Sequence, residues 1–161
     1  MSEVSRRHSL RFSTFDEVIA DAEHLNRVGY DRVGKWDLGQ VIGHVSEWIR
    51  YPMDGYPKIS FPFSILMWAL RNTVGKPEKK KLLAQGKFPS GGPTVKESVP
   101  PAGKDELVAI SQLKALIDRV NRYEGKLFPS PFFGELTRED WLKLSLIHAA
   151  HHLSFLVPKT N

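Results

Sequence analysis

The chain has 161 residues, of which 41% are hydrophobic and 25% are charged, and these proportions fit a single globular domain over residues 1–161. It contains no cysteine, which excludes disulfides, thiolate metal ligands and a cysteine nucleophile, and which favours a cytoplasmic location. The net charge is +5, but the basic residues do not alternate with aromatic residues along the chain, so we expect no nucleic-acid partner. No apolar run approaches 20 residues, so we expect no membrane partner.

Two capped helices are predicted in the first third of the chain. The first begins at a capping box formed by Thr14 and Glu17 and ends at Gly29. The second begins at Asp37, and Pro52 is expected to stop it. Apolar residues recur at helical spacing in both segments, so one face of each helix should pack in a core.

The middle of the chain combines an apolar helix with an irregular connection. A helix is predicted over residues 63–73, and because it is apolar nearly all round we expect it to be deeply buried. Residues 76–103 are rich in proline and glycine, so they predict a long crossover loop of the kind that is often functional or mobile.

Two further helices are predicted in the last third. The fourth covers residues 105–123, and the last begins at the capping residue Thr137 and ends before Pro158. No segment alternates clearly enough to predict a strand. Helices of this length with one long crossover predict an all-α fold, a four-helix bundle.

Two histidines lie one turn apart on the last predicted helix. His148 and His152 are four residues apart, so their side chains point about 40° from each other on one face. The same face carries Trp141, Leu144 and Phe155, so the pair should point into the core. Buried imidazoles need partners, which either a metal ion or hydrogen bonds to buried carbonyl groups would supply.

Three other residues extend this candidate site. His44 lies on the inner face of the second predicted helix, so His44, His148 and His152 can meet around one divalent ion; a lone core histidine is the alternative. Glu47, three residues later, is a candidate catalytic base or fourth ligand, or else a solvated glutamate. His151 points about 100° away from His152, so we expect it beside the ligands or on the helix surface.

The segments around these histidines resemble a known family. Residues 36–44, WDLGQVIGH, resemble the tryptophan-to-histidine segment of the second helix in the DinB-like (YfiT-like) superfamily. Residues 148–153, HAAHHL, resemble its closing histidine motif. Residues 131–137, PFFGELT, followed by Trp141, look like an uncharacterised bacterial branch of that superfamily.

The resemblance implies an up-down-down-up four-helix bundle in which His44, His148 and His152 are the metal triad. It also implies kinship with metal-dependent thiol transferases that use low-molecular-weight thiols, and with hydrolases. Phe155 stands where many relatives carry glutamine, so details of substrate binding do not transfer.

A three-histidine site would leave coordination positions on a divalent ion for water or substrate. Zinc or nickel fits nitrogen ligands best, with iron and manganese as alternatives. Such an ion lowers the pKa of a bound water or thiol. We therefore predict an enzyme that activates water or a small thiol for attack on a small-molecule substrate, a hydrolase or a thiol transferase. The alternative is a non-catalytic metal-binding helical bundle, and a homodimer is left open.

Overall fold

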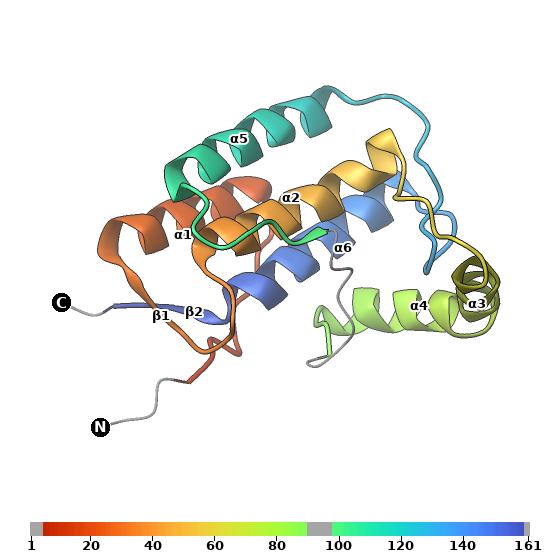
Figure 1. Cartoon of the computed structure of the whole chain (residues 1–161), viewed down its shortest axis with the longest axis horizontal. Helices are drawn as coiled ribbons and strands as arrows, with labels where there is room; N and C mark the ends of the chain where they lie inside the picture. Colours follow the sequence, from red (N-terminus) through yellow and green to blue (C-terminus); the bar gives the residue numbers. More distant parts are fainter. Residues whose placement is uncertain (1–4, 90–97, 160–161) are drawn as a thin grey trace.

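The fold is mainly helical with a small two-stranded sheet, so the predominantly helical class predicted from the sequence is confirmed (Figure 1). The computed structural model describes residues 5–89 and 98–159. The helices are α1 (Phe15–Val28), α2 (Leu38–Asp54), α3 (Phe63–Leu70), the π-helix η1 (Arg71–Gly75), α4 (Lys76–Gln85), α5 (Glu106–Arg122) and α6 (Arg138–Leu153). The strands are β1 (Tyr30–Arg32) and β2 (Leu156–Pro158), which pair antiparallel.

The starts of the long helices follow the predicted capping residues. The Thr14 side chain caps α1 in a capping box with Glu17, and the Asp37 side chain caps α2 by accepting a hydrogen bond from the Gln40 backbone N–H. Thr137 caps α6 in the same manner. Each cap satisfies backbone N–H groups that the helix itself leaves without a partner, so these boundaries are fixed locally.

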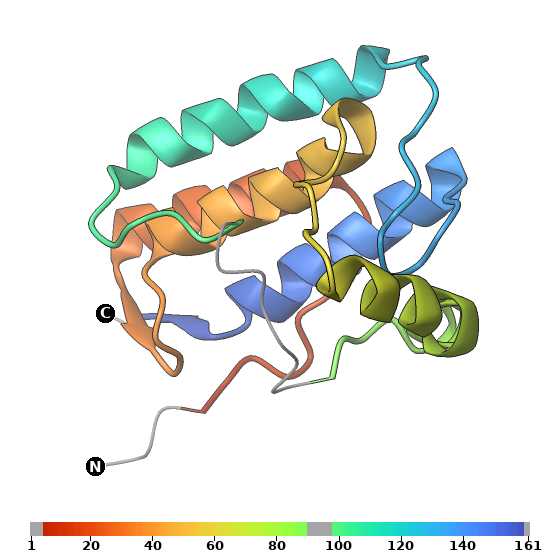
Figure 2. The ribbon, with the colours of Figure 1, turned by 45° about the vertical axis from the view of Figure 1, so that its right-hand side comes forward.

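The helices α1, α2, α5 and α6 pack on one another and enclose the main core, as Figure 2 shows. Helix α2 contacts α1, α5 and α6, and α1 also contacts α5 and α6. Fully buried apolar side chains from all four helices fill the space between them, among them Leu25, Ile42, Leu113 and Trp141. The indole N–H of Trp141 donates to the carbonyl of Ile49 at 3.1 Å, so α6 is tied to α2 by a buried polar contact as well as by packing.

Two predicted helix ends are wrong. Helix α2 continues through Pro52 to Asp54: Pro52 lies in the last turn of the helix, and its carbonyl accepts from the Phe128 N–H at 2.8 Å. Helix α6 ends at Leu153, and residues 156–158 form β2 instead of helix. The strand exists because Leu156–Pro158 pairs with Tyr30–Arg32, a contact between distant segments that local alternation does not reveal.

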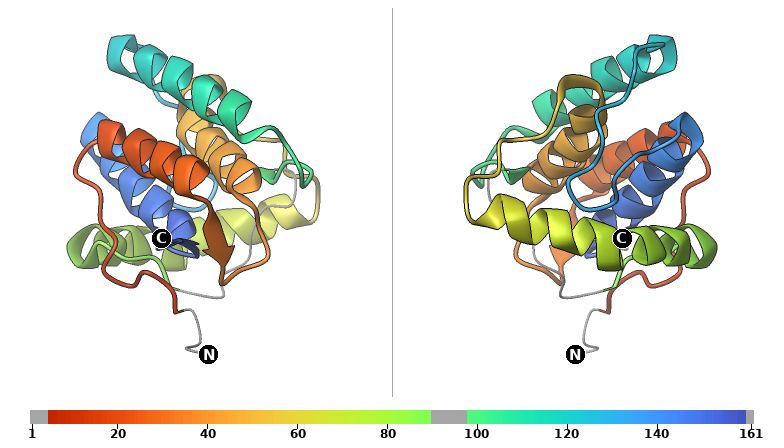
Figure 3. Two further views of the ribbon diagram at one scale, coloured as in Figure 1. Left: turned by 90° about the vertical axis from the view of Figure 1, so that its left-hand side faces the viewer. Right: turned by 90° about the vertical axis from the view of Figure 1, so that its right-hand side faces the viewer.

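The middle of the chain differs most from expectation. α3, η1 and α4 follow one another without a break as a bent helical rod at one end of the molecule (Figure 3, right), and Figure 1 shows α3 end-on where α4 is seen from the side. No residue of α3 is buried, so the prediction of a deeply buried helix is wrong. Its main contacts are with η1, the next turn of the same rod. The predicted irregular loop over 76–103 begins with helix α4, and residues 90–97 of that loop lie outside the described residues.

Candidate metal centre

Three histidines from two helices converge at one point of the core. His44 comes from α2, and His148 and His152 come from α6. The Nε2 atom of His148 lies 3.2 Å from Nε2 of His44 and 3.0 Å from Nε2 of His152. One nitrogen from each ring lies within 4.8 Å of the others, so the three side chains form a group that can hold a metal ion. The predicted trio is therefore brought together.

The spacing of these nitrogen atoms suits a coordination polyhedron. A tetrahedral ion with metal–nitrogen bonds of about 2.0–2.1 Å places its ligand atoms about 3.3–3.4 Å apart. An octahedral ion with similar bonds places neighbouring ligand atoms about 2.8–3.0 Å apart. The two separations from His148, 3.0 and 3.2 Å, lie close to these values, and the third pair, from His44 and His152, lies within 4.8 Å.

Burial keeps the rings neutral, which is the form that binds metal. Desolvation lowers the pKa of His44 to about 4 and that of His152 to about 2, and it lowers the pKa of His148 well below its ordinary value. The neighbouring rings add to the effect, because a positive charge on one imidazole disfavours a second charge beside it. Each ring therefore offers an uncharged nitrogen at neutral pH.

Without a cation, the hydrogen-bonding of these rings is incomplete. Three nitrogen atoms face one another, and a single N–H on His148 can be donated fully to only one of its two neighbours. The Nδ1 atom of His148 is buried and has no hydrogen-bond partner among the described residues. Unpaired buried polar atoms are costly, and a divalent ion would use the three converging lone pairs at once, although it would leave the buried Nδ1 of His148 as it is. The residues present therefore fit a metal.

A serine orients His44 from behind. The Nδ1 atom of His44 lies 2.8 Å from the hydroxyl of Ser98, and both residues are buried. A proton held on Nδ1 by this contact leaves the Nε2 lone pair free to point at the other histidines. Partners of this kind fix the tautomer and the ring angle of metal ligands.

Two glycines allow Ser98 to reach that position. A Cβ atom on Gly39 would lie 2.6 Å from the carbonyl oxygen of Lys104, and one on Gly43 would lie 2.5 Å from Cγ of Pro100. Both distances are far below ordinary contact, so any side chain would push the 98–104 segment away from α2. Gly39 and Gly43 of the WDLGQVIGH segment therefore let the 98–104 segment approach α2 closely enough for Ser98 to reach His44.

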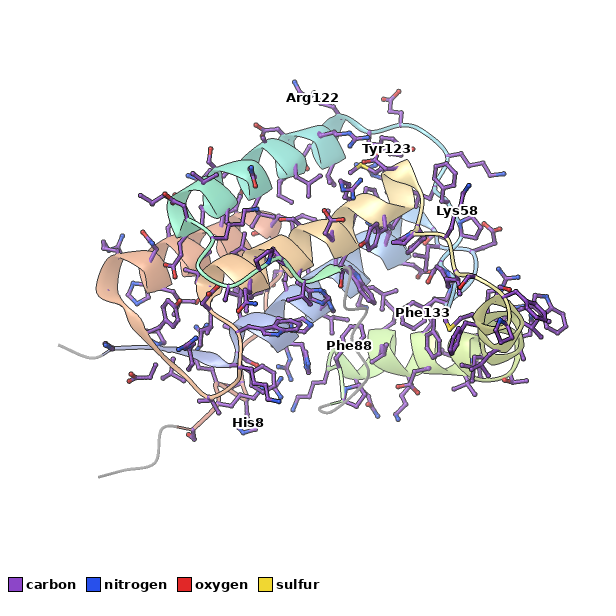
Figure 4. The ribbon with its side chains drawn as sticks, viewed as in Figure 1. His8, Lys58, Phe88, Arg122, Tyr123 and Phe133 are labelled. Atoms are coloured by element: carbon purple, nitrogen blue, oxygen red, sulfur yellow. The ribbon has the colours of Figure 1, made fainter. Side chains whose placement is uncertain are left out.

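Aromatic rings form the walls of the centre. Trp36 stacks on His152 with centroids 5.1 Å apart, and Trp48 stacks on His148 at 4.0 Å. Phe88 approaches His148 edge-on at 5.5 Å, and Figure 4 shows it between the end of α4 and α6. His44 and His148 are buried and His152 is half-buried, so the centre is most accessible beside His152.

The amino-terminal arm lies beside the accessible side. The Arg6 guanidinium donates to the Ser154 hydroxyl at 2.5 Å, lies 3.0 Å from Nδ1 of His151 and stacks over the Phe155 ring. Burial and the nearby Arg6 charge lower the pKa of His151 to about 4. His151 is half-buried and is not part of the metal-binding group, as its direction on the helix predicts.

Glu47 lies apart from the converging nitrogen atoms. Its carboxylate accepts a hydrogen bond of 2.6 Å from Arg50, and both residues line a cavity of about 190 Å³ between α2 and α5. It is close enough to raise the pKa of His44 slightly by its charge, against the larger effect of burial. Among the described residues, the group able to hold a metal contains the three histidines and no carboxylate.

Sequence reasoning misses Ser98, Phe88 and Arg6, which all contact a histidine of this region. For Ser98 the only sequence signal is indirect, the pair Gly39 and Gly43 on one side of a predicted helix. For Phe88 and Arg6 there is none, because their places depend on chain segments that meet only in the folded protein.

A family model described as "Protein of unknown function (DUF1569)" matches residues 4–159, and the chain belongs to this family. No curated protein and no solved structure gives a significant match. The membership of the DinB-like superfamily expected from the histidine motifs is therefore wrong, since the matching family is a different one. Two histidines four residues apart satisfy a geometric need of any helical metal site, so this spacing does not identify a family.

Proposed function

Because this family has no assigned function, we propose one from the chemistry of the site. We propose that His44, His148 and His152 hold one divalent metal ion and that the protein is a metal-dependent enzyme acting on a small molecule. The observation that carries the proposal is the convergence of three neutral Nε2 atoms at 3.0 and 3.2 Å in a site walled by aromatic rings.

The donor set favours particular ions. Three imidazole nitrogens without a carboxylate or thiolate suit zinc or nickel best, and iron or manganese are the alternatives. Three protein ligands leave at least one coordination position open, which is typical of catalytic rather than structural sites. When bound, such an ion would lower the pKa of a water or thiol and polarise an electrophilic substrate.

The residues of the chain would supply the rest of the chemistry. With its proton on Nδ1 and donated to the Ser98 hydroxyl, His44 would direct the lone pair of Nε2 at the centre. Trp36, Trp48 and Phe88 exclude bulk water and limit the substrate to a small, partly apolar molecule. We therefore favour attack by water or by a low-molecular-weight thiol, that is, a hydrolase or a thiol transferase.

Glu47 is our candidate for a general base, acting on a proton at the edge of the site. To do so its carboxylate must exchange the contact with Arg50 for one with substrate. Glu47→Gln should lower turnover while leaving the metal content unchanged. Equal turnover in the parent and this variant would remove Glu47 from the mechanism without affecting the metal site.

At the level of the fold, we propose that α1, α2, α5 and α6 form a four-helix bundle of the up-down-down-up kind. Their mutual contacts support this arrangement, and the link through α3 and α4 would be the long crossover. The metal site would then join the second and the last helix of the bundle.

The metal proposal is tested by elemental analysis of protein purified without a histidine tag. The parent should carry one ion per chain and His148→Ala should carry none. His24→Ala is the matched control, because His24 lies on α1 beside Arg27 and should not affect metal content. Equal metal in the parent and in a variant lacking all three site histidines would refute the proposal.

Catalysis needs a separate experiment. Thiols paired with electrophiles, and ester and amide substrates, should be tested with the parent and with His148→Ala. Turnover should rise with pH as the nucleophile loses its proton and should vanish in the variant. A crystal structure in which four or more protein groups saturate the ion would instead support the alternative, a non-catalytic metal-binding protein.

A further inference from the structure

Helix α3 and its flanks expose large apolar side chains at one end of the molecule. Phe61 is 78% exposed, Phe63 is 63% exposed and Trp68 is 61% exposed; Ile65, Leu66 and Val74 are also exposed. Together these side chains present on the order of 700 Å² of apolar surface, more than the roughly 300–600 Å² of the largest patch on a typical monomer. Exposed apolar surfaces of this size usually mark a site of interaction with a protein, a ligand or a membrane.

The exposed side chains surround the helix. At about 100° per residue, Phe63, Trp68, Ile65 and Leu66 point at about 0°, 140°, 200° and 300° around the α3 axis. The polar side-chain groups in Phe63–Leu70 are the hydroxyl of Ser64 and the indole N–H of Trp68, and no side chain there is charged. A protein groove covers one face of a helix, whereas the interfacial region of a bilayer takes side chains to a depth of about 5–10 Å, close to the diameter of a helix of about 10–12 Å.

Positive charge is concentrated in the same part of the chain. Residues 56–88 contain seven Lys or Arg and one Asp or Glu, a net charge of +6, compared with +5 for the whole chain. All remaining residues therefore sum to −1. Lys58, Lys76 and Lys80 flank α3 along the chain and are exposed, and Figure 4 shows Lys58 on the loop that enters α3.

This charge distinguishes between the occupants. The area alone would suit a dimer, which needs about 800 Å² from each partner. A second copy, however, would bring two segments of +6 together, and the repulsion would oppose the contact. An anionic lipid surface has the opposite charge, and each Lys or Arg near it strengthens binding.

We propose that α3 and the basic residues around it dock this protein on an anionic phospholipid membrane. The aromatic and aliphatic side chains of α3 enter the interfacial region, while Lys58, Arg71, Lys76 and Lys80 contact lipid headgroups. Within the described part of the chain, no helix is long and apolar enough to cross a membrane. The expectation of no membrane partner rests on the lack of an apolar run long enough to span a bilayer. A helix that lies on the membrane surface needs no such run, so that expectation does not exclude surface docking.

The rest of the protein holds the docking helix in place. A Cβ atom on Gly75 would lie 1.8 Å from the carbonyl oxygen of Phe132, so η1 rests directly on the turn before α6. Lys79 of α4 forms an ion pair of 2.9 Å with Asp140 of α6. Leu82 is buried with Phe133 and Leu144. The rod is therefore anchored through η1 and α4, which leaves α3 projecting.

The proposal is tested by sedimentation with vesicles of phosphatidylcholine alone and of phosphatidylcholine mixed with an equal part of phosphatidylglycerol. The parent should bind the anionic vesicles at about 0.1 M salt, be released at about 1 M salt and not bind the neutral vesicles. The variant F63Q/L66Q/W68Q should lose binding. The matched control L107Q/V108Q, which removes exposed apolar side chains of α5, should bind as the parent does.

The charges are tested in the same assay. K58Q/K76Q/K80Q should weaken partition about fivefold for each lysine, or about a hundredfold in total. Its control, R32Q/K35Q/K159Q, removes three exposed cations at the opposite end of the molecule and should change partition far less.

Three results would overturn the proposal. Equal binding to neutral and anionic vesicles would remove the role of charge, and unchanged binding of F63Q/L66Q/W68Q would remove the role of α3. The third result has two parts: the parent does not bind vesicles, and it forms a stable dimer in sedimentation velocity that is absent in F63Q/L66Q/W68Q. A second copy of the chain would then be the partner that covers α3. All substituted side chains are exposed and none of them contributes to the group of three histidines, so the circular dichroism and metal content of the variants should match the parent.

Discussion

Replacing Gly43 with alanine should damage the metal centre without touching a ligand. The new Cβ atom would lie 2.5 Å from Cγ of Pro100, whereas carbon atoms in contact are about 3.5–4.0 Å apart. Pro100 must therefore retreat by about 1 Å or more. Ser98 is two residues away on the same segment, so its hydroxyl should move with Pro100.

The size of the effect follows from the contact that is lost. Ser98 lies 2.8 Å from Nδ1 of His44, and a shift of about 1 Å takes this pair beyond hydrogen-bond distance. Losing such a partner typically weakens metal binding about 10–100-fold, or about 1.4–2.7 kcal/mol. Stability should change less, because alanine in a helix gains about 1 kcal/mol over glycine and offsets part of an overpacking cost of about 1–3 kcal/mol.

The assay is competition for zinc with a chromophoric chelator. Gly43→Ala, Ser98→Ala and the double variant should all bind zinc with similarly reduced affinity, because the two substitutions break the same contact. Gly34→Ala is the control, since its Cβ would meet only Phe155, at 3.4 Å. Parental affinity in Gly43→Ala, or a double variant as weak as the product of the two single effects, would refute the reasoning.

Three further predictions concern the ion, pH and the docking rod. Chelation should lower Tm by roughly 10 °C, the loss of about 4 kcal/mol of binding linkage, while helical circular dichroism at 25 °C persists; collapse of that signal would mean that the ion is needed for folding. The pKa values of His44 and His151 are lowered to about 4 in the folded protein, so the unfolded chain binds more protons between pH 6.5 and pH 4. The free energy of unfolding of the metal-free protein should therefore fall as the pH falls through that window, by up to about 1.4 kcal/mol per pH unit for each ring; urea unfolding at pH 7 and pH 5 measures this, and equal stability would contradict the burial of the rings. Gly75→Ala should detach the rod from the Phe132 carbonyl, and limited proteolysis should then cut η1 faster than in the parent; an unchanged digestion pattern would contradict that contact.

The parts of the fold that depend on neighbouring residues could be predicted from the sequence. Thr14 and Asp37 cap their helices through side-chain bonds to residues three positions later. The trio of histidines could be predicted because helical spacing puts His148 and His152 on one face, and the inner position of His44 puts it opposite.

The parts that depend on distant segments could not be predicted. The apolar composition of α3 does not reveal whether a core, a partner or a lipid surface will cover it. Ser98 reaches His44 only because the chain folds back across 54 residues. Helix α4 is different, because sequence analysis misses it although its signals are local. Pro77 lies in its first turn and Gly86 ends it in a left-handed conformation, but the many other proline and glycine residues nearby obscure these two signals.

The separation of the ligands along the chain governs when the centre can form. His44 precedes His148 by 104 residues, so at ordinary rates of synthesis His44 leaves the ribosome about 5–20 s before its partners. During that interval one imidazole alone cannot hold a divalent ion firmly, and two of the three ligands do not yet exist. Loading with the proposed ion must therefore follow translation of α6, from the free or carrier-bound ions that the cell then supplies. In recombinant protein, an ion bound at this site would likewise be taken from those available in the cell once the chain is complete.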